Sequence, residues 1–397
     1  MRQRGIPILM VLLLSLCAGC SLPVRQHAVP RALTSQAVIP GMPGVRYLVH
    51  SGDMPEMAAD VLESLRKEHI WLAQQGKASG QLPPASFLAL SGGGDDGAFG
   101  AGLLSGWSKA GNRPQFKLVT GISTGALLAP FAFLGSEQDD VLRKVYTQSK
   151  PEDILEERGI LAAITNDALA DNAPLGRLTE KYITQDTLKA IAGEHAKGRL
   201  LLMATTNLDS RQAVIWNMTK LAASNHPDAL KLFRKIMLAS AAIPGAFPPA
   251  LIDVEVNGKP YQEMHVDGGA TAQVFVYPPS FKLGELSKQQ GITRERHLYV
   301  VRNSRLDPDW AEVERQTLSI AGRPISSLIQ TQGAGDLYRI YSIATRDGVD
   351  YNLAYIPRNF QSVHMEEFDT EYMRLLFQKG YDMAVKGYPW EKQPPGF

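Results

Sequence analysis

The pentapeptide GISTG at residues 121–125 joins an apolar run at Phe116–Thr120 to a run of small and apolar residues at Ala126–Leu134. The first run predicts a buried strand and the second a buried helix. A Gly-x-Ser-x-Gly turn between a strand and a helix is typical of a nucleophile elbow, where only glycine fits on either side of the serine. We therefore expect Ser123, flanked by Gly121 and Gly125, to present its hydroxyl at the start of the helix, as in a serine hydrolase.

A second glycine-rich stretch, SGGGDDGAFG at residues 91–100, lies between a predicted strand, Ser86–Leu90, and a predicted helix, Ala98–Lys109. Glycines there let backbone N–H groups approach an anion at a helix N-terminus. Its Gly-x-Gly-x-x-Gly pattern can also mark a dinucleotide site, but two aspartates in the loop would repel a pyrophosphate. An oxyanion hole, which stabilises a transient charge through backbone N–H groups, agrees better with these acids. The candidate hole residues are Gly92, Gly93, Gly94 and Gly97.

A carboxylate that could partner the serine stands in the stretch Val266-Asp267-Gly268-Gly269. Because Gly268 and Gly269 leave room around it, Asp267 could reach a hydroxyl with little steric hindrance. An Asp-Gly pair is also common in a plain β-turn, so this stretch alone does not decide between the two interpretations.

Strand and helix patterns alternate along the rest of the chain. This alternation predicts an α/β protein with a mainly parallel sheet. Further strands are expected at Arg199–Thr205, Ala213–Met218, Leu298–Arg302 and Tyr351–Ile356, and further helices at Met54–Gln75, Ala229–Ser240, Asp309–Gln316, Ile325–Thr345 and Thr370–Lys386.

The N-terminus resembles a bacterial lipoprotein signal. Two arginines precede an apolar stretch at Ile6–Leu16 that is too short to span a bilayer, and Cys20 follows small residues. We expect residues 1–19 to be a signal peptide, Cys20 to carry a lipid, and the Pro-containing residues 20–45 to form a tether. An ordinary secretory signal is the alternative. Ser21 after the cysteine resembles enterobacterial sorting signals, and this resemblance implies the outer membrane, facing the periplasm.

The bulk composition excludes other classes of protein. The chain has 397 residues, a formal net charge of +1, and 44% hydrophobic residues. Because there is no basic excess, we expect no nucleic-acid partner. No His/Cys/Asp spacing suggests a metal site, and the sequence indicates no cofactor. The oligomeric state cannot be predicted from the sequence.

The glycine loop, the serine pentapeptide and the Asp-Gly-Gly turn occur in the order found in patatin-like phospholipases. Residues 239–249, ASAAIPGAFPP, resemble a further segment of that family. The resemblance implies a three-layer α/β/α fold and a lipid acyl hydrolase with a lipid substrate. It also implies a Ser–Asp dyad in which Ser123 is the nucleophile and Asp267 the base. Residues 46–397 would be the hydrolase domain, with a C-terminal helical extension.

One position departs from the family pattern. The family usually has Arg or Lys before the last glycine of its loop, where this chain has Asp96, preceded by Asp95. The departure leaves the phospholipid substrate open. Two other functions also remain possible: a Ser-His-Asp esterase using His297 or His364, and an inactive scaffold that binds acyl chains or a partner protein. His265, two residues before Asp267, could tune the aspartate or be a buried polar residue.

Overall fold

The central feature of the protein is a nine-stranded sheet, seen in a computed structural model that describes residues 25–49, 54–77, 82–158, 167–308, 310 and 312–397. Its main path runs β1-β7-β6-β3-β2-β10-β11, in which β6, β3, β2, β10 and β11 are mutually parallel. The α/β class and the mainly parallel sheet are therefore confirmed. The strands are β1 (Arg46–Leu48), β2 (Ala85–Leu90), β3 (Phe116–Gly121), β6 (Leu200–Asn207), β7 (Gln212–Asn217), β8 (Ala250–Val256), β9 (Lys259–Asp267), β10 (Arg296–Arg302) and β11 (Asp350–Tyr355).

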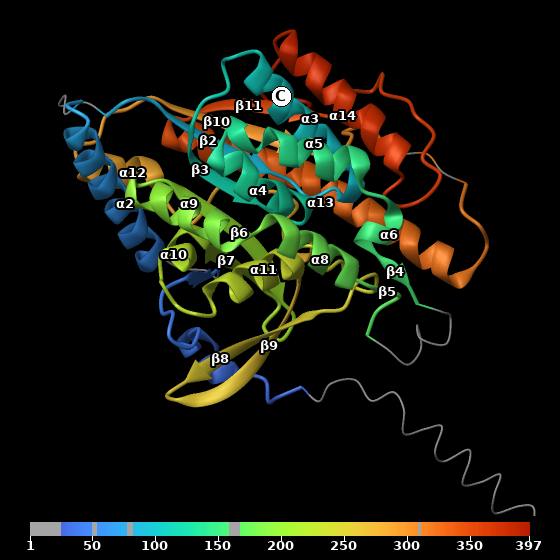
Figure 1. Ribbon diagram of the computed structural model, residues 1–397, viewed down its shortest axis with the longest axis horizontal. Coiled ribbons are helices and arrows are strands. Elements are labelled where there is room, and N and C mark those ends of the chain that lie inside the picture. The colour runs from blue at the N-terminus through green and yellow to red at the C-terminus, as the bar shows by residue number, and fades with distance from the viewer. Residues whose placement is uncertain (1–24, 50–53, 78–81, 159–166, 309, 311) are drawn as a thin grey trace, which may run out of the picture.

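Helices cover both faces of the sheet, which gives the predicted three layers (Figure 1). Successive side chains of a strand point to opposite faces, so Leu88 and Leu90 of β2 join one core cluster while Phe87 and Ala89 join the other. The first cluster includes residues of α3 (Gly97–Lys109), α4 (Thr124–Leu134), α5 (Asp139–Gln148), α9 (Gln185–Ala196), α10 (Met218–Ala222), α11 (Ala229–Ser240) and α14 (Thr370–Val385). The second includes residues of α2 (Pro55–Gln74), α12 (Leu283–Gln289) and α13 (Thr317–Asp347).

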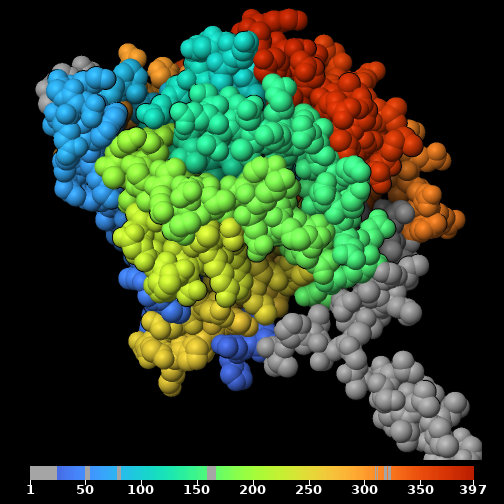
Figure 2. Space-filling model, in the orientation of Figure 1, coloured from blue at the N-terminus to red at the C-terminus, as the bar shows by residue number. Residues whose placement is uncertain are grey.

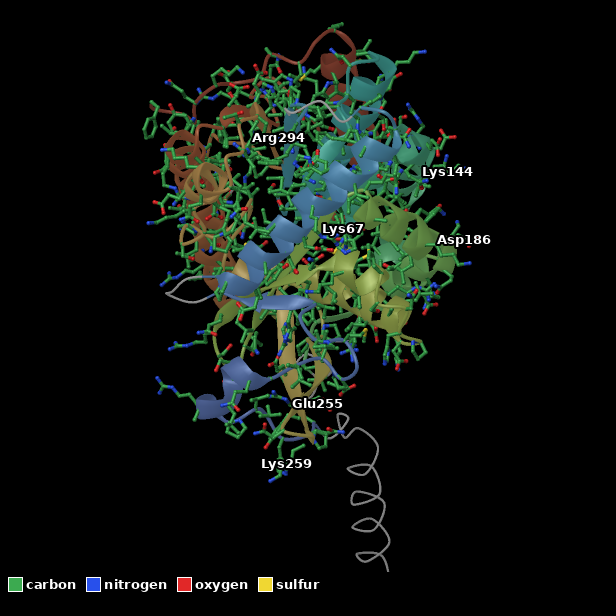
Figure 3. The ribbon with its side chains drawn as sticks, turned by 90° about the vertical axis from the view of Figure 1, so that its left-hand side faces the viewer. Lys67, Lys144, Asp186, Glu255, Lys259 and Arg294 are labelled. Carbon is green, nitrogen blue, oxygen red and sulfur yellow. The ribbon has the colours of Figure 1, made fainter. Side chains whose placement is uncertain are left out.

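A projecting hairpin and a group of short elements beside α11 complete the fold. The antiparallel hairpin β8–β9 projects from the sheet, with Glu255 and Lys259 near its tip (Figure 3). β9 pairs with β6, which brings the end of the hairpin back to the sheet. Beside α11 lie α6 (Pro151–Ile154), α8 (Ala173–Tyr182) and the short ladder of β4 (Glu156–Glu157) with β5 (Ala170–Asp171).

The described part of the predicted tether lies against the domain. Val29, Ile39 and Met42 are buried, and Val38 bridges to Glu255 of β8. Figure 2 shows this segment in blue beside the yellow hairpin. Residues 25–45 therefore differ from a plain tether, because their apolar side chains gain burial on the hairpin. Cys20 and the predicted signal peptide lie outside the described residues.

The region after residue 278 also differs from a helical extension. It supplies β10 and β11 to the central sheet, and α14 packs closely on α3. The predicted helix at residues 309–316 is wrong, since residues 310 and 312–316 are not helical, and Trp310 and Val313 are exposed instead of packed on the core. The helix predicted from Ile325 instead begins at Thr317, because Pro324 is accommodated inside α13.

Candidate active site

Ser123 occupies the sharp turn predicted from the glycines around it. β3 ends at Gly121, α4 begins at Thr124, and Ser123 between them has φ 54° and ψ −127°, an unusual conformation for a non-glycine residue. A Cβ at Gly121 would lie 2.4 Å from the Gly125 carbonyl oxygen, and one at Gly125 would lie 2.3 Å from the Leu90 carbonyl oxygen. Both positions therefore require glycine, and the turn holds the serine in one strained geometry.

Asp267, the last residue of β9, lies beside Ser123. It is almost fully buried, its carboxyl lies close enough to the Ser123 hydroxyl for that hydroxyl to favour the ionised form, and Oδ1 accepts the Gly269 N–H at 2.6 Å. Burial raises the pKa of Asp267 to about 7, although the Ser123 hydroxyl and the Gly269 N–H act in the opposite direction. Gly268 is needed because a Cβ there would lie 2.6 Å from the Ala204 carbonyl oxygen. The structure thus brings Ser123, Asp267, Gly268 and Gly269 together.

Ser240, at the end of α11, positions the elbow, and sequence reasoning missed it. Its Oγ accepts the Ser123 N–H at 3.1 Å and donates to the Ala204 carbonyl at 2.8 Å. The carbonyl of Ala242, two residues later, accepts the Asp267 N–H at 2.8 Å. The segment that begins at Ala239 therefore supports the backbones of both candidate catalytic residues. The only signal in the sequence was the family resemblance of residues 239–249.

The four glycines predicted for the oxyanion hole are not equivalent. The Gly92 N–H donates to the Gln273 carbonyl at 3.0 Å, and the Gly97 N–H donates to the carbonyls of Gly94 and Asp95. These two amides are already used, so their assignment to the hole is corrected. Within the described part of the chain, no atom accepts a hydrogen bond from the amides of Gly93 and Gly94.

Asn303, directly after β10, fixes the shape of this loop and was not predicted. Its Nδ2 donates to the Ser91 carbonyl at 2.9 Å, and its backbone N–H donates to Ser91 Oγ at 2.8 Å. Gly93 has φ +154°, and a Cβ there would lie 1.9 Å from the Asn303 carbonyl oxygen. A side chain at Gly93 therefore cannot be accommodated without moving the loop.

The two aspartates that depart from the family pattern bind the C-terminal segment of the chain. One Asp95 carboxylate oxygen accepts His364 Nε2 at 2.7 Å and the Phe368 N–H at 2.9 Å. The Tyr372 hydroxyl donates to Asp96 at 2.6 Å. Burial raises the pKa of Asp96 to about 7. Both carboxylates are thus held by side chains and backbone from beyond β11, and Asp95 fixes Phe368 at φ +61°.

An apolar cavity opens from Ser123 and Gly94. Phe368 forms part of its wall, so the Asp95 contact also shapes this cavity. The cavity runs between helices on the α4 face of the sheet and presents mostly carbon atoms to a ligand. Its lining includes Leu127, Phe131, Leu142, Leu175, Met237 and Phe247.

The histidines considered for the site, His265 beside Asp267 and the triad candidates His297 and His364, bind other groups. His265 is fully buried between Thr205, at 2.8 Å from Nδ1, and Glu263, at 3.0 Å from Nε2. His297 contacts Asp350, and His364 contacts Asp95. Within the residues that the structure describes, no group of three His, Cys, Asp or Glu side chains is arranged to hold a metal ion, and no helix is long and apolar enough to cross a bilayer.

Comparisons with known proteins identify the family of this region. Residues 88–278 match the model of the family described as patatin-like phospholipase. A comparison with curated proteins finds no match. Among solved structures, the chain is similar to VipD from Legionella pneumophila, with a TM-score of 0.32 and 11% identity over 77% of this chain and 67% of that one. Both values are too low to inform about function.

The matched segment contains every motif on which the resemblance was based. The glycine loop, the Ser123 elbow, residues 239–249 and the Asp267 turn all fall within it. The family supports lipid acyl hydrolysis as the general activity of this region. Residues 88–278 are therefore a patatin-like phospholipase domain.

Proposed function

We propose that this protein hydrolyses carboxylic esters of membrane lipids through a Ser123–Asp267 dyad and an acyl-serine intermediate. The observation that carries the proposal is the position of the buried Asp267 carboxyl beside the Ser123 hydroxyl, which lines an apolar cavity. A carboxyl with a pKa of about 7 is partly ionised at neutral pH and can accept a proton there.

In the first half of the reaction, Ser123 Oγ attacks the ester carbonyl while Asp267 takes the hydroxyl proton. The amides of Gly93 and Gly94 would donate to the oxyanion that forms. The C–O bond to the leaving alcohol then breaks, Asp267 returns the proton to that alcohol, and the acyl group stays on the serine.

In the second half, water replaces the alcohol. Asp267 removes a proton from the water as its oxygen attacks the acyl carbonyl, and the tetrahedral intermediate collapses with release of the fatty acid. The proton passes to Ser123 Oγ, which restores the free enzyme. The fixed backbone of the elbow and the loop means that the polar groups need little rearrangement between the two halves.

The cavity supports a lipid as the substrate. Its carbon-rich wall suits an acyl chain, because burying each methylene is worth about 0.8 kcal/mol. Asp95 and Asp96 do not oppose a phospholipid strongly, since each carboxylate is already hydrogen-bonded to the C-terminal segment.

We also propose that Cys20 carries a lipid anchor that holds the protein at the outer membrane, facing the periplasm. An anchored enzyme meets lipid substrate at a raised local concentration. Cys20→Ala should move the protein from the membrane fraction to the soluble fraction and remove metabolic labelling by a radioactive fatty acid. Retention of both properties in the variant would refute the anchor.

The experiment that tests the catalytic proposal is hydrolysis of phospholipid vesicles and of a short soluble ester by the purified chain. Ser123→Ala and Asp267→Asn should each lose acyl release from vesicles, and an alkyl fluorophosphonate should label the native protein but not Ser123→Ala. Activity on the soluble ester alone, abolished by a single His→Gln variant, would favour a Ser-His-Asp esterase. No labelling and no turnover would favour the inactive scaffold.

A further inference from the structure

A second apolar cavity lies on the opposite face of the sheet. It is enclosed by α2, by the start of several strands and by the segment that leads into α12. Figure 3 shows α2 crossing this face of the molecule, with Lys67 on the helix and Arg294 near one end of it. Side chains that line the cavity include Met57, Val61, Phe87, Leu202, Val276 and Leu286.

Because the lining of this cavity is mostly carbon, it offers water few hydrogen-bond partners. Protein interiors are normally packed as densely as organic crystals, and an unfilled apolar space loses dispersion contacts on its walls. Apolar cavities stay dry and accept apolar ligands. An alkyl chain is therefore the kind of ligand that suits this lining.

One end of the cavity carries an excess of positive charge. Lys117 and Arg294 share a single carboxylate, Glu68, at 2.7 Å and 2.9 Å. Arg296, half-buried at the start of β10, donates to Ser287 Oγ at 2.7 Å. Among the described residues, no carboxylate lies within ion-pair distance of the Arg296 guanidinium. Three cations thus meet one anion at this end.

The carboxylates elsewhere around the cavity are already neutralised. Asp60, two turns of α2 before Glu68 and about 12 Å from it along the axis, pairs with Lys220 at 2.9 Å and binds the Tyr47 hydroxyl. Asp347, which also acts on Arg296 at longer range, binds Arg346, the Tyr277 hydroxyl and the Gly284 N–H. The positive charge near Arg296 is therefore not cancelled by these groups.

We infer that this cavity binds a long-chain fatty acid, with the alkyl chain alongside α2 and the carboxylate on Arg296. A guanidinium matches the planar carboxylate through paired N–H donors, and the partly dry setting strengthens the contact. The cavity serves binding and not hydrolysis, because its two lining serines donate to the carbonyls of Gly198 and Leu283 and face no base. This site is separate from the Ser123 cavity and does not depend on the activity proposed for it.

The test uses the full chain with Ser123→Ala, held in nanodiscs, and a palmitate analogue that carries a diazirine. Photo-crosslinks should map to residues 57–65 or 276–292 and should disappear under excess palmitate. The Arg296→Gln variant should weaken palmitate binding at this site about tenfold, whereas Arg296→Lys, which keeps the charge, should weaken it less than threefold. Lys282→Gln, which removes an exposed charge from the residue before α12, is the matched control and should bind normally.

Two further measurements decide the outcome even if Arg296→Gln folds poorly. Val61→Trp should fill the cavity and abolish these crosslinks while crosslinks near Ser123 persist. Hexadecanol, which lacks the carboxylate, should compete at least tenfold less well than palmitate. Crosslinks confined to the Ser123 cavity, or equal competition by the alcohol, would overturn the inference whether or not the protein proves to be a hydrolase.

Discussion

The two apolar cavities have similarly carbon-rich walls, yet only one contains the parts of a candidate catalytic site. The first opens at Ser123, beyond the carboxyl end of β3. The second lies near the amino ends of the parallel strands, where Ala85, Leu200 and Arg296 begin β2, β6 and β10. In open parallel sheets, ligand chemistry is found beyond the carboxyl ends, where strands turn into helices and leave backbone amides unpaired. An apolar cavity can therefore hold an alkyl chain at either end of the sheet. The carboxyl ends of the strands are where catalytic groups can be placed beside it.

The largest expected difference between the cavities concerns the nucleophile. Ser123→Ala should lower hydrolysis on the order of 10⁴- to 10⁶-fold, because no other group can form the acyl intermediate. Arg296→Gln, in the second cavity, should leave kcat/KM within about twofold. Initial rates on phospholipid vesicles measure both. A large loss in Arg296→Gln would show that the two cavities are not independent.

The next effect concerns the loop that supplies the free amides. Gly93→Ala should lower kcat by about 10²- to 10³-fold, since its Cβ would lie 1.9 Å from the Asn303 carbonyl oxygen and must displace the loop. Gly76→Ala is the control: Gly76 also has a positive φ, +68°, but no atom lies within 4 Å of its added Cβ. This control should cost only about 1 kcal/mol of backbone strain. Equal kcat for the two variants would show that Gly93 is not part of the catalytic site.

The pH dependence of the first cavity follows from Asp267. The base must be ionised, and its pKa is about 7, so kcat/KM should rise about tenfold per pH unit below 7 and level off above it. Asp96 also has a raised pKa of about 7 but binds Tyr372 instead of Ser123. Asp96→Asn should therefore keep the inflection near pH 7. A profile that stays flat from pH 5 to 8 in the native protein would contradict Asp267 as the base.

The smallest effect concerns the wall of the first cavity. Asp95→Ala would leave the Phe368 N–H without its acceptor, which costs about 1–3 kcal/mol of stability. With Phe368 less well held, KM for long-chain esters should rise about fivefold while kcat changes less than twofold. Glu366→Ala, on the same segment and exposed, should leave KM unchanged. A fall in kcat with KM unchanged would place Asp95 in the chemistry instead of in the cavity wall.

Much of the fold could be predicted because its core elements are strongly patterned. β2, β3, α3, α4 and α11 all lie within two residues of their expected ends, since each has an apolar run or stripe bounded by glycine, proline or polar residues. The hairpin β8–β9 was missed, because its strands are half exposed and carry charged residues. The start of α13 was predicted too late, and Pro324, a residue that local preference disfavours inside a helix, lies within the missed part.

The candidate site was predictable where local backbone demands fix the residue type. Ser123 could be predicted from the glycines beside it, whereas the Asp-Gly-Gly turn alone left Asp267 undecided and the family resemblance pointed to it. Ser240 and Asn303 could not, because they act through contacts across 117 and 212 residues of chain, to Ser123 and to Ser91. The local sequence around a serine or an asparagine does not indicate which distant residue its side chain will contact.

By itself, the sequence determined the alternation of strands and helices, the strained turn at Ser123 and the glycine loop, because these follow from hydrophobic periodicity and from the space that a Cβ needs. Only the tertiary structure decided which amides of that loop are free, that Asp95 and Asp96 hold the C-terminal segment, and that a positive group faces a second cavity. Those properties depend on contacts between side chains that are far apart in the sequence. The whole fold sets the burial and the charge of the groups that make these contacts.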